Sequence, residues 1–161
     1  MKVSTLLLIL SLLGASSAAW ACSYDGQFNN PFAESYPGSL SIALATQRAI
    51  SQQQITQTDK LEGQQGLRRA SWWLQLFVKQ ITLLPNEVHI YLVDSQLWSK
   101  YQVGTPLKIH SDPPPNGEVV LMLSESALDN LVSKNISITQ AMRMGLVNTN
   151  ESASKMINIG I

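Results

Sequence analysis

The chain has 161 residues, and eleven Lys and Arg residues balance eleven Asp and Glu residues to give a formal net charge of +0 at pH 7. This balance lacks the clustered positive charge that binding to a phosphate backbone requires, so we expect no nucleic-acid partner. The length is enough for one hydrophobic core and too short for two ordinary domains. The single cysteine, Cys22, excludes an internal disulfide.

The first 21 residues predict a cleavable secretory signal peptide. They contain one positive charge at Lys2, an apolar run over 6–13, and small residues that lead into Ala19-Trp20-Ala21. The apolar run is well below the ~20 residues of a membrane-spanning helix. We therefore expect cleavage after Ala21, and a periplasmic or secreted protein with no permanent membrane span.

Cys22 would be the first residue after this cleavage, which leaves two alternatives for its side chain. Attachment of a lipid to Cys22 would make the protein a membrane-anchored lipoprotein. The residue three positions before it is Ala19 rather than the branched apolar residue usual at such processing sites, which favours an unpaired thiol.

We expect residues 22–38 to form an extended leader and residues 39–161 to form a single α+β domain. Gly, Pro, Asn and Ser recur in the leader and interrupt helix and strand periodicity, while Phe28, Phe32 or Tyr36 are placed to pack onto the core. Residues 40–44 fit a strand or one face of a helix. A helix with glutamines on its exposed face is expected over about 46–60.

The rest of the chain alternates between helix and strand patterns. Apolar residues in steps of three and four predict a helix over 67–84, which Pro85 should end. Alternation with a period of two predicts a strand over 88–93. Turn residues after it separate further expected strands over 97–101, 107–110 and 119–123. Ser124 and Ser137 are placed as N-caps of helices over 124–133 and 137–145, and a last strand is expected over 155–159. The expected fold is an antiparallel sheet of about five strands covered by helices.

The sequence predicts no catalytic, cofactor or metal site. The two histidines, His89 and His110, are each expected in a strand, and neither stands beside another ligand type at metal spacing. The chain contains no Gly-rich phosphate loop, H-E-x-x-H, G-x-S-x-G or C-x-x-C motif. We therefore expect that the protein is not an enzyme.

Residues 119–147, VVLMLSESALDNLVSKNISITQAMRMGLV, carry the most specific pattern in the chain. The strand that runs into Ser124-Glu125 and the second helix that carries Ala141 and ends at Gly145-Leu146 resemble the end of the sterol-carrier-protein type of lipid-binding domain. The preceding strands fit that family's order of elements. The resemblance implies an apolar tunnel between sheet and helices for a lipid or another hydrophobic small molecule, with no catalytic residues.

The residues expected to line such a tunnel lie on predicted inward faces and include adaptable methionines. They are Trp73, Phe77, Leu121, Leu128, Met142 and Met144. The same side chains can instead fill a closed core. In that alternative the protein is an accessory or protein-interaction domain, and Trp72, Trp98, Tyr101 and the prolines at 113–115 contact a partner protein.

Overall fold

The structure is a computed structural model that describes residues 22–26, 34–80 and 84–150. The helical elements are a short 3-10 helix η1 (Ser23–Asp25), α2 (Ser39–Ser51), α3 (Gly63–Gln80), α4 (Glu125–Val132) and α5 (Ile138–Arg143). The strands are β1 (Glu87–Leu92), β2 (Leu97–Gln102), β3 (Lys108–Ile109), β4 (Val120–Leu123) and β5 (Val147–Thr149). The predicted α+β class is therefore confirmed.

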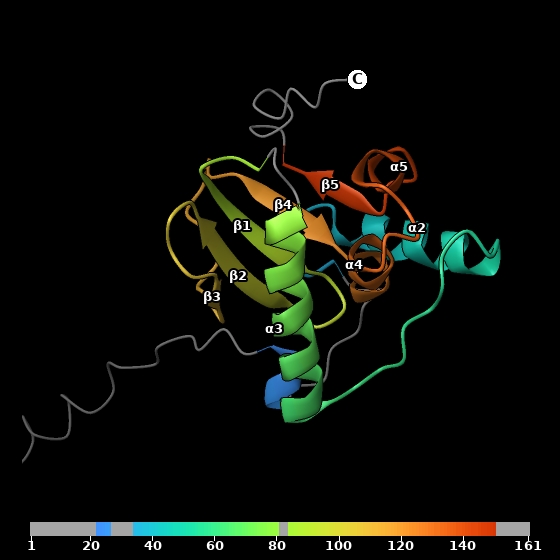
Figure 1. The fold of residues 1–161 in the computed structure, drawn as a ribbon, viewed down its shortest axis with the longest axis horizontal. Helices are drawn as coiled ribbons and strands as arrows, with labels where there is room; N and C mark the ends of the chain where they lie inside the picture. Colours follow the sequence, from blue (N-terminus) through green and yellow to red (C-terminus); the bar gives the residue numbers. More distant parts are fainter. Residues whose placement is uncertain (1–21, 27–33, 81–83, 151–161) are drawn as a thin grey trace, which may run out of the picture.

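The strands form one five-stranded sheet in the order β3-β2-β1-β4-β5 (Figure 1). Three of the four neighbouring pairs are antiparallel, but β1 and β4 run parallel, with Ile90 opposite Leu121. The sheet is thus mixed, whereas a purely antiparallel sheet was expected. The parallel pair arises because the chain leaves β3 at one edge and returns on the far side of β1.

Both faces of the central strands are buried. On one face, Val88, Ile90 and Leu92 pack with Leu121 and Leu123 into the main core, which α3 and α4 cover (Figure 1). On the other face, side chains from β1, β2 and β4 pack with Ile42 of α2 in a second, smaller cluster, which contains Tyr91, Val93, Trp98, Val120 and Met122. Burial on both sides explains why β4 is a continuous apolar run without alternation.

The two predicted helix caps after β4 are confirmed. The Ser124 hydroxyl accepts a hydrogen bond from the backbone N–H of Ala127 and begins α4. Ser137 begins α5 and shares a capping box with Gln140. Gly145, with φ +72°, lies just past the end of α5.

Several predicted boundaries differ from the structure. Residues 40–44 belong to a helix and not to a strand, and α2 ends at Ser51, so the predicted helix over 46–60 begins too late and runs too far. α3 begins one turn earlier than expected, at Gly63. Strand β5 over Val147–Thr149 was not predicted, and the expected strand over 155–159 lies outside the described residues.

The leader is not wholly extended, because Ser23–Asp25 form η1. Tyr24 is buried and Tyr36 packs on the second cluster, whereas Phe28 and Phe32 lie outside the described residues, as does the predicted signal peptide. Across the described part of the chain, every helix is too short or too polar to cross a membrane.

Candidate functional site

The six residues predicted to line a tunnel gather in the main core. Phe77, Leu121 and Leu128 are buried members of that core. Trp73, Met142 and Met144 are partly buried and pack against it, and the Trp73 ring also lies 4.7 Å from the Arg69 guanidinium carbon. Their role as tunnel walls stays a prediction. Only Phe77 among the six lines one of two cavities at the edges of the main core.

The two cavities lie at the edges of the main core. The smaller, of about 390 Å³, lies between the end of α3 and the turn from α4 into α5 and is lined by Phe77, Leu131 and Ile136 among others. The larger, of about 480 Å³, lies between η1, α2, the segment 57–62 and the start of α4. We call the larger one the α2 cavity; its volume is in the usual range for small-molecule sites.

The lining of the α2 cavity combines apolar and acidic side chains. Ala43 and Ile50 of α2, together with Leu61, supply apolar surface. Four acidic side chains line it against a single lysine: Asp59, Glu62, Asp94 and Glu125 against Lys60. That lysine is itself paired with Glu62, at 3.3 Å. The cavity therefore carries a negative local charge although the whole chain is neutral.

The segment that closes this cavity has no regular secondary structure, and a buried asparagine of α4 anchors it. Asn130 is 1% exposed. Its side-chain amide donates to the backbone oxygens of Thr56 and Ser126, both at 2.8 Å, and its oxygen accepts from the Thr56 N–H at 3.1 Å. Next along the segment, the Thr58 hydroxyl donates to Asp129 at 2.7 Å. Side-chain hydrogen bonds from α4 thus satisfy backbone groups of this segment, as a neighbouring strand would do in a sheet.

A buried group of polar side chains forms the floor of the cavity. The Tyr24 hydroxyl donates to Glu125, and the Glu125 carboxylate also meets Arg69 at 3.4 Å. One oxygen of Asp94 accepts from the backbone N–H of Glu125 at 2.6 Å, at the first turn of α4. Carboxylates at a helix N-terminus are electrostatically favourable, which explains why α4 tolerates two of them there.

Burial and the neighbouring charge shift two of these groups. Burial raises the pKa of Asp94 to about 6, with a smaller contribution from the negative charge of Glu125. Burial and the same carboxylate raise the pKa of Tyr24, which keeps its hydroxyl protonated as a donor. The cavity floor therefore combines a permanent donor with a carboxyl group that titrates close to neutral pH.

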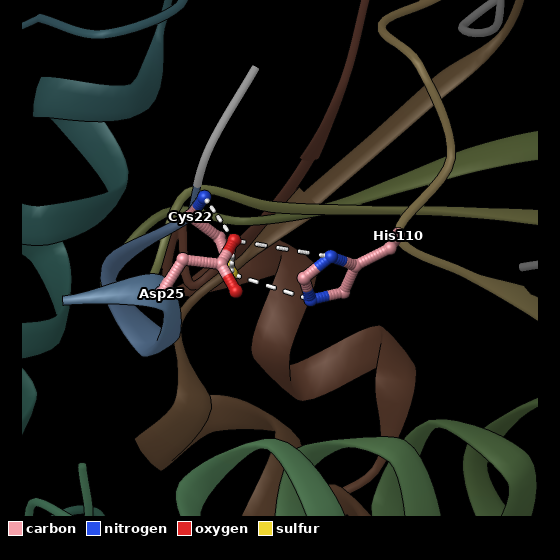
Figure 2. A group of neighbouring side chains, drawn as sticks. All are labelled: Cys22, Asp25 and His110. Carbon is pink, nitrogen blue, oxygen red and sulfur yellow. Dashed lines mark hydrogen bonds and ion pairs between the residues drawn. The ribbon is translucent and has the colours of Figure 1, made fainter. Parts of the chain in front are cut away.

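A second group of polar side chains lies on the other side of η1 and was not foreseen. The Cys22 sulfur lies 3.4 Å from Nε2 of His110 and 3.6 Å from Oδ2 of Asp25, and the same oxygen lies 4.0 Å from Nδ1 of His110 (Figure 2). Burial raises the pKa of the Cys22 thiol. Cys22 and His110 are 88 residues apart, so no spacing in the sequence could have joined them.

The surface predicted to contact a partner protein is only partly present. Trp98 is 6% exposed and stacks on Tyr91 with a centroid distance of 4.4 Å, so it is a core residue and not a contact residue. Trp72 is 58% exposed, so its ring is accessible to a partner. Tyr101 and the prolines at 113–115 are also at least partly exposed, so the interaction-domain alternative stays a prediction that rests on them and on Trp72.

No known family model and no curated protein matches the chain. Among solved structures, a double mutant of the sec-alkyl sulfatase PisA1 is similar to it, with 13% sequence identity and a TM-score of 0.37. The similarity covers 73% of this chain and only 20% of that protein. A likeness at this level carries no argument about function.

Proposed function

We propose that the protein is a non-catalytic binding domain that holds a small amphiphilic molecule in the α2 cavity. The observation that carries the proposal is the lining of that cavity, which combines apolar side chains such as Ile50 with the carboxylates of Asp94 and Glu125. An apolar ligand body would be bound by area removed from water, at ~25 cal/mol per Å². The buried carboxylates of Asp94 and Glu125 favour a head group that is cationic or donates hydrogen bonds.

Binding without chemical turnover is favoured by the groups that face the cavity. The side chains that line it include neither histidine nor cysteine among the described residues. Two of its hydroxyls are already engaged, since Thr46 donates to Ser124 at 2.9 Å and Thr58 donates to Asp129. Among the lining hydroxyls of the described residues, that of Thr58 has a carboxylate beside it, and this hydrogen bond holds the cavity wall on α4.

The proposal is tested with three probes that share a dodecyl chain and differ in their head: an amine, an alcohol and a carboxylate. We expect the amine to bind most tightly and the carboxylate least, in titrations at pH 7 below the micelle concentration of each probe. Equal affinities for all three would show that the acidic floor does not contact the head group and would contradict the proposed site.

A matched pair of variants on α2 locates the binding site. Gln47 is exposed and lines the cavity, so Gln47→Trp should fill its mouth and abolish binding of the amine probe without disturbing the core. Leu44, 49% exposed on the same helix, does not line the cavity, so Leu44→Trp should bind as the unmodified protein does. Equal binding by both variants would place the ligand elsewhere.

We also propose that the domain acts outside the cytoplasm, after cleavage of the chain behind Ala21. The support is the signal-like sequence of residues 1–21. The intact mass of protein purified from its host tests this. A chain that retains residues 1–21 would refute it.

A further inference from the structure

The cluster of Cys22, Asp25 and His110 lies apart from the α2 cavity and holds three different metal-ligating groups close together. The thiol, the carboxylate and the imidazole each offer one ligand atom, and these atoms lie within 4.8 Å of one another. In tetrahedral zinc sites, bonds of ~2.0–2.3 Å place neighbouring ligand atoms roughly 3.3–3.6 Å apart. The separations of 3.4 Å and 3.6 Å from the Cys22 sulfur are of this size. The Asp25 oxygen approaches the His110 ring at 4.0 Å, through Nδ1, so a small rotation of these exposed side chains completes the set.

The backbone holds two of these side chains in place from the same short element. Cys22 is the N-cap of η1 and Asp25 is its last residue. η1 is fixed to the turn between β1 and β2, because the N–H of Ser23 donates to the Ser95 carbonyl at 2.8 Å. The next side chain, Tyr24, is buried and bonded to Glu125. The capping box of η1, in which the Asp25 carboxylate accepts from the Cys22 N–H at 3.3 Å, sets the spacing between thiol and carboxylate. The contacts of Ser23 and Tyr24 fix η1 on the rest of the fold.

His110 reaches the cluster through an unusual backbone conformation. Its φ of +59° lies in the left-handed region, which a residue with a side chain seldom adopts. Ile109, the last residue of β3, pairs with Ser99, and the next hydrogen bond along this edge runs from Ser111 to the Trp98 carbonyl at 3.1 Å. His110 lies between these two contacts, just past the strand, and its imidazole faces the thiol (Figure 2).

Charge and access at the cluster suit a divalent cation. Such an ion would compensate the charges of one thiolate and one carboxylate. The side chains of His110 and Asp25 are 36% and 43% exposed, so an ion can enter from solvent and keep a water ligand.

We propose that Cys22, Asp25 and His110 form a binding site for Zn²⁺. The ligands are the Cys22 sulfur, one Asp25 carboxylate oxygen and His110 Nε2. Binding releases the Cys22 thiol proton to solvent, so the affinity rises with pH. In a chain cleaved after Ala21, the Cys22 nitrogen, 3.3 Å from Asp25 Oδ2, becomes an amine and offers a fourth donor.

A second group of possible ligands, Glu87, His89 and Glu118, provides the internal comparison. Unlike the Cys22 cluster, this group has a lysine beside it: Glu87 is paired with Lys100, whose positive charge repels a cation. Within the group, His89 lies 2.7 Å from Glu118. We therefore expect no zinc at this group, and His89→Gln serves as the matched histidine control.

The test uses the protein expressed from the full chain, kept reduced and freed of metal, and titrated with Zn²⁺ and with Co²⁺. We expect one equivalent of Zn²⁺, a higher melting temperature, and for Co²⁺ a thiolate charge-transfer band with the visible bands of a tetrahedral site. Cys22→Ser should abolish the charge-transfer band. A protein that binds no Zn²⁺, or a Co²⁺ complex without that band, would overturn the proposal.

The replacement for His110 is chosen to suit the positive φ at this position. Asn tolerates positive φ better than most residues, so His110→Asn removes the imidazole without adding strain. It should weaken Zn²⁺ binding by at least about 10-fold, because the loss of even an outer-shell partner of a metal site typically costs ~10–100-fold. Unchanged affinity in His110→Asn, weakening in His89→Gln alone, or a diacylglycerol on Cys22 in the intact mass would each refute the site.

Discussion

Replacement of Asn130 by Asp tests how the wall of the α2 cavity is held. The change is almost isosteric, but it replaces the side-chain amide that donates to the Thr56 and Ser126 carbonyls, each at 2.8 Å. A carboxylate oxygen would then face two carbonyl oxygens in a position that is 1% exposed. Leaving a buried charge uncompensated typically costs ~3–5 kcal/mol, which is the loss of stability we expect at pH 7.

The pH dependence separates this cause from a general packing defect. Burial should raise the pKa of the new carboxyl group in the folded protein above its unfolded value of ~4. The stability of Asn130→Asp, relative to the unmodified protein, should therefore fall as pH rises from ~4 and level off above the folded pKa. Urea unfolding at several pH values measures both effects.

The control for this variant makes the same chemical change at the surface. Asn148 in β5 is exposed, and its side-chain oxygen only accepts a hydrogen bond, from Thr149 at 2.8 Å. A carboxylate can accept that bond equally well, so Asn148→Asp should change stability by no more than ~0.5 kcal/mol. Equal stability of the two variants at pH 7 would refute the role assigned to Asn130.

Three further changes test other parts of the site. Gly66→Ala should lose ~1–3 kcal/mol of stability relative to Gln65→Ala, because a Cβ at Gly66 would lie 2.4 Å from a Tyr24 ring carbon and 2.5 Å from a backbone oxygen. Thermal melts compare the two variants, and a Gly66→Ala protein more stable than the unmodified one would contradict this packing. Ser124→Ala should cost ~1–2 kcal/mol in urea unfolding, because it removes the α4 cap, and an unchanged midpoint would refute that role. The Asp94 pKa of about 6 lies above its unfolded value of 3.8, so protonated Asp94 favours the folded state and this contribution to stability is lost as pH rises through that interval. Asp94→Asn should flatten the dependence of stability on pH in this interval. An NMR titration that places the Asp94 pKa below 4 would disprove the shift.

Local patterns in the sequence were sufficient to predict many of the elements. The apolar stripe of α3, the alternation in β1 and the hydroxyl caps at Ser124 and Ser137 each depend on neighbours within a few residues. The parallel pairing of β1 with β4 could not be read in this way, because β4 is buried on both faces and shows no alternation. Segment 40–44 was ambiguous because its apolar residues fit both periods.

The candidate sites were harder to predict than the fold, because each is built from distant segments. The wall of the α2 cavity over 57–62 has no periodicity, and its position depends on Asn130, which bonds the adjoining Thr56 from 74 residues further along the chain. Cys22 and Asp25 meet His110 only through the fold. The predicted tunnel residues were chosen because they lie on inward faces. Side chains on inward faces mostly pack against each other and fill the core, as Leu121 and Leu128 do.

The central claim, that a small molecule occupies the α2 cavity, is tested most directly by native mass spectrometry of protein purified from its own host. We predict an adduct of defined mass that is lost after solvent extraction, is absent from Gln47→Trp and is retained by Leu44→Trp. Absence of any adduct from the unmodified protein, together with no binding of the dodecyl amine, would contradict the claim. An adduct of equal abundance in Gln47→Trp would contradict it as well.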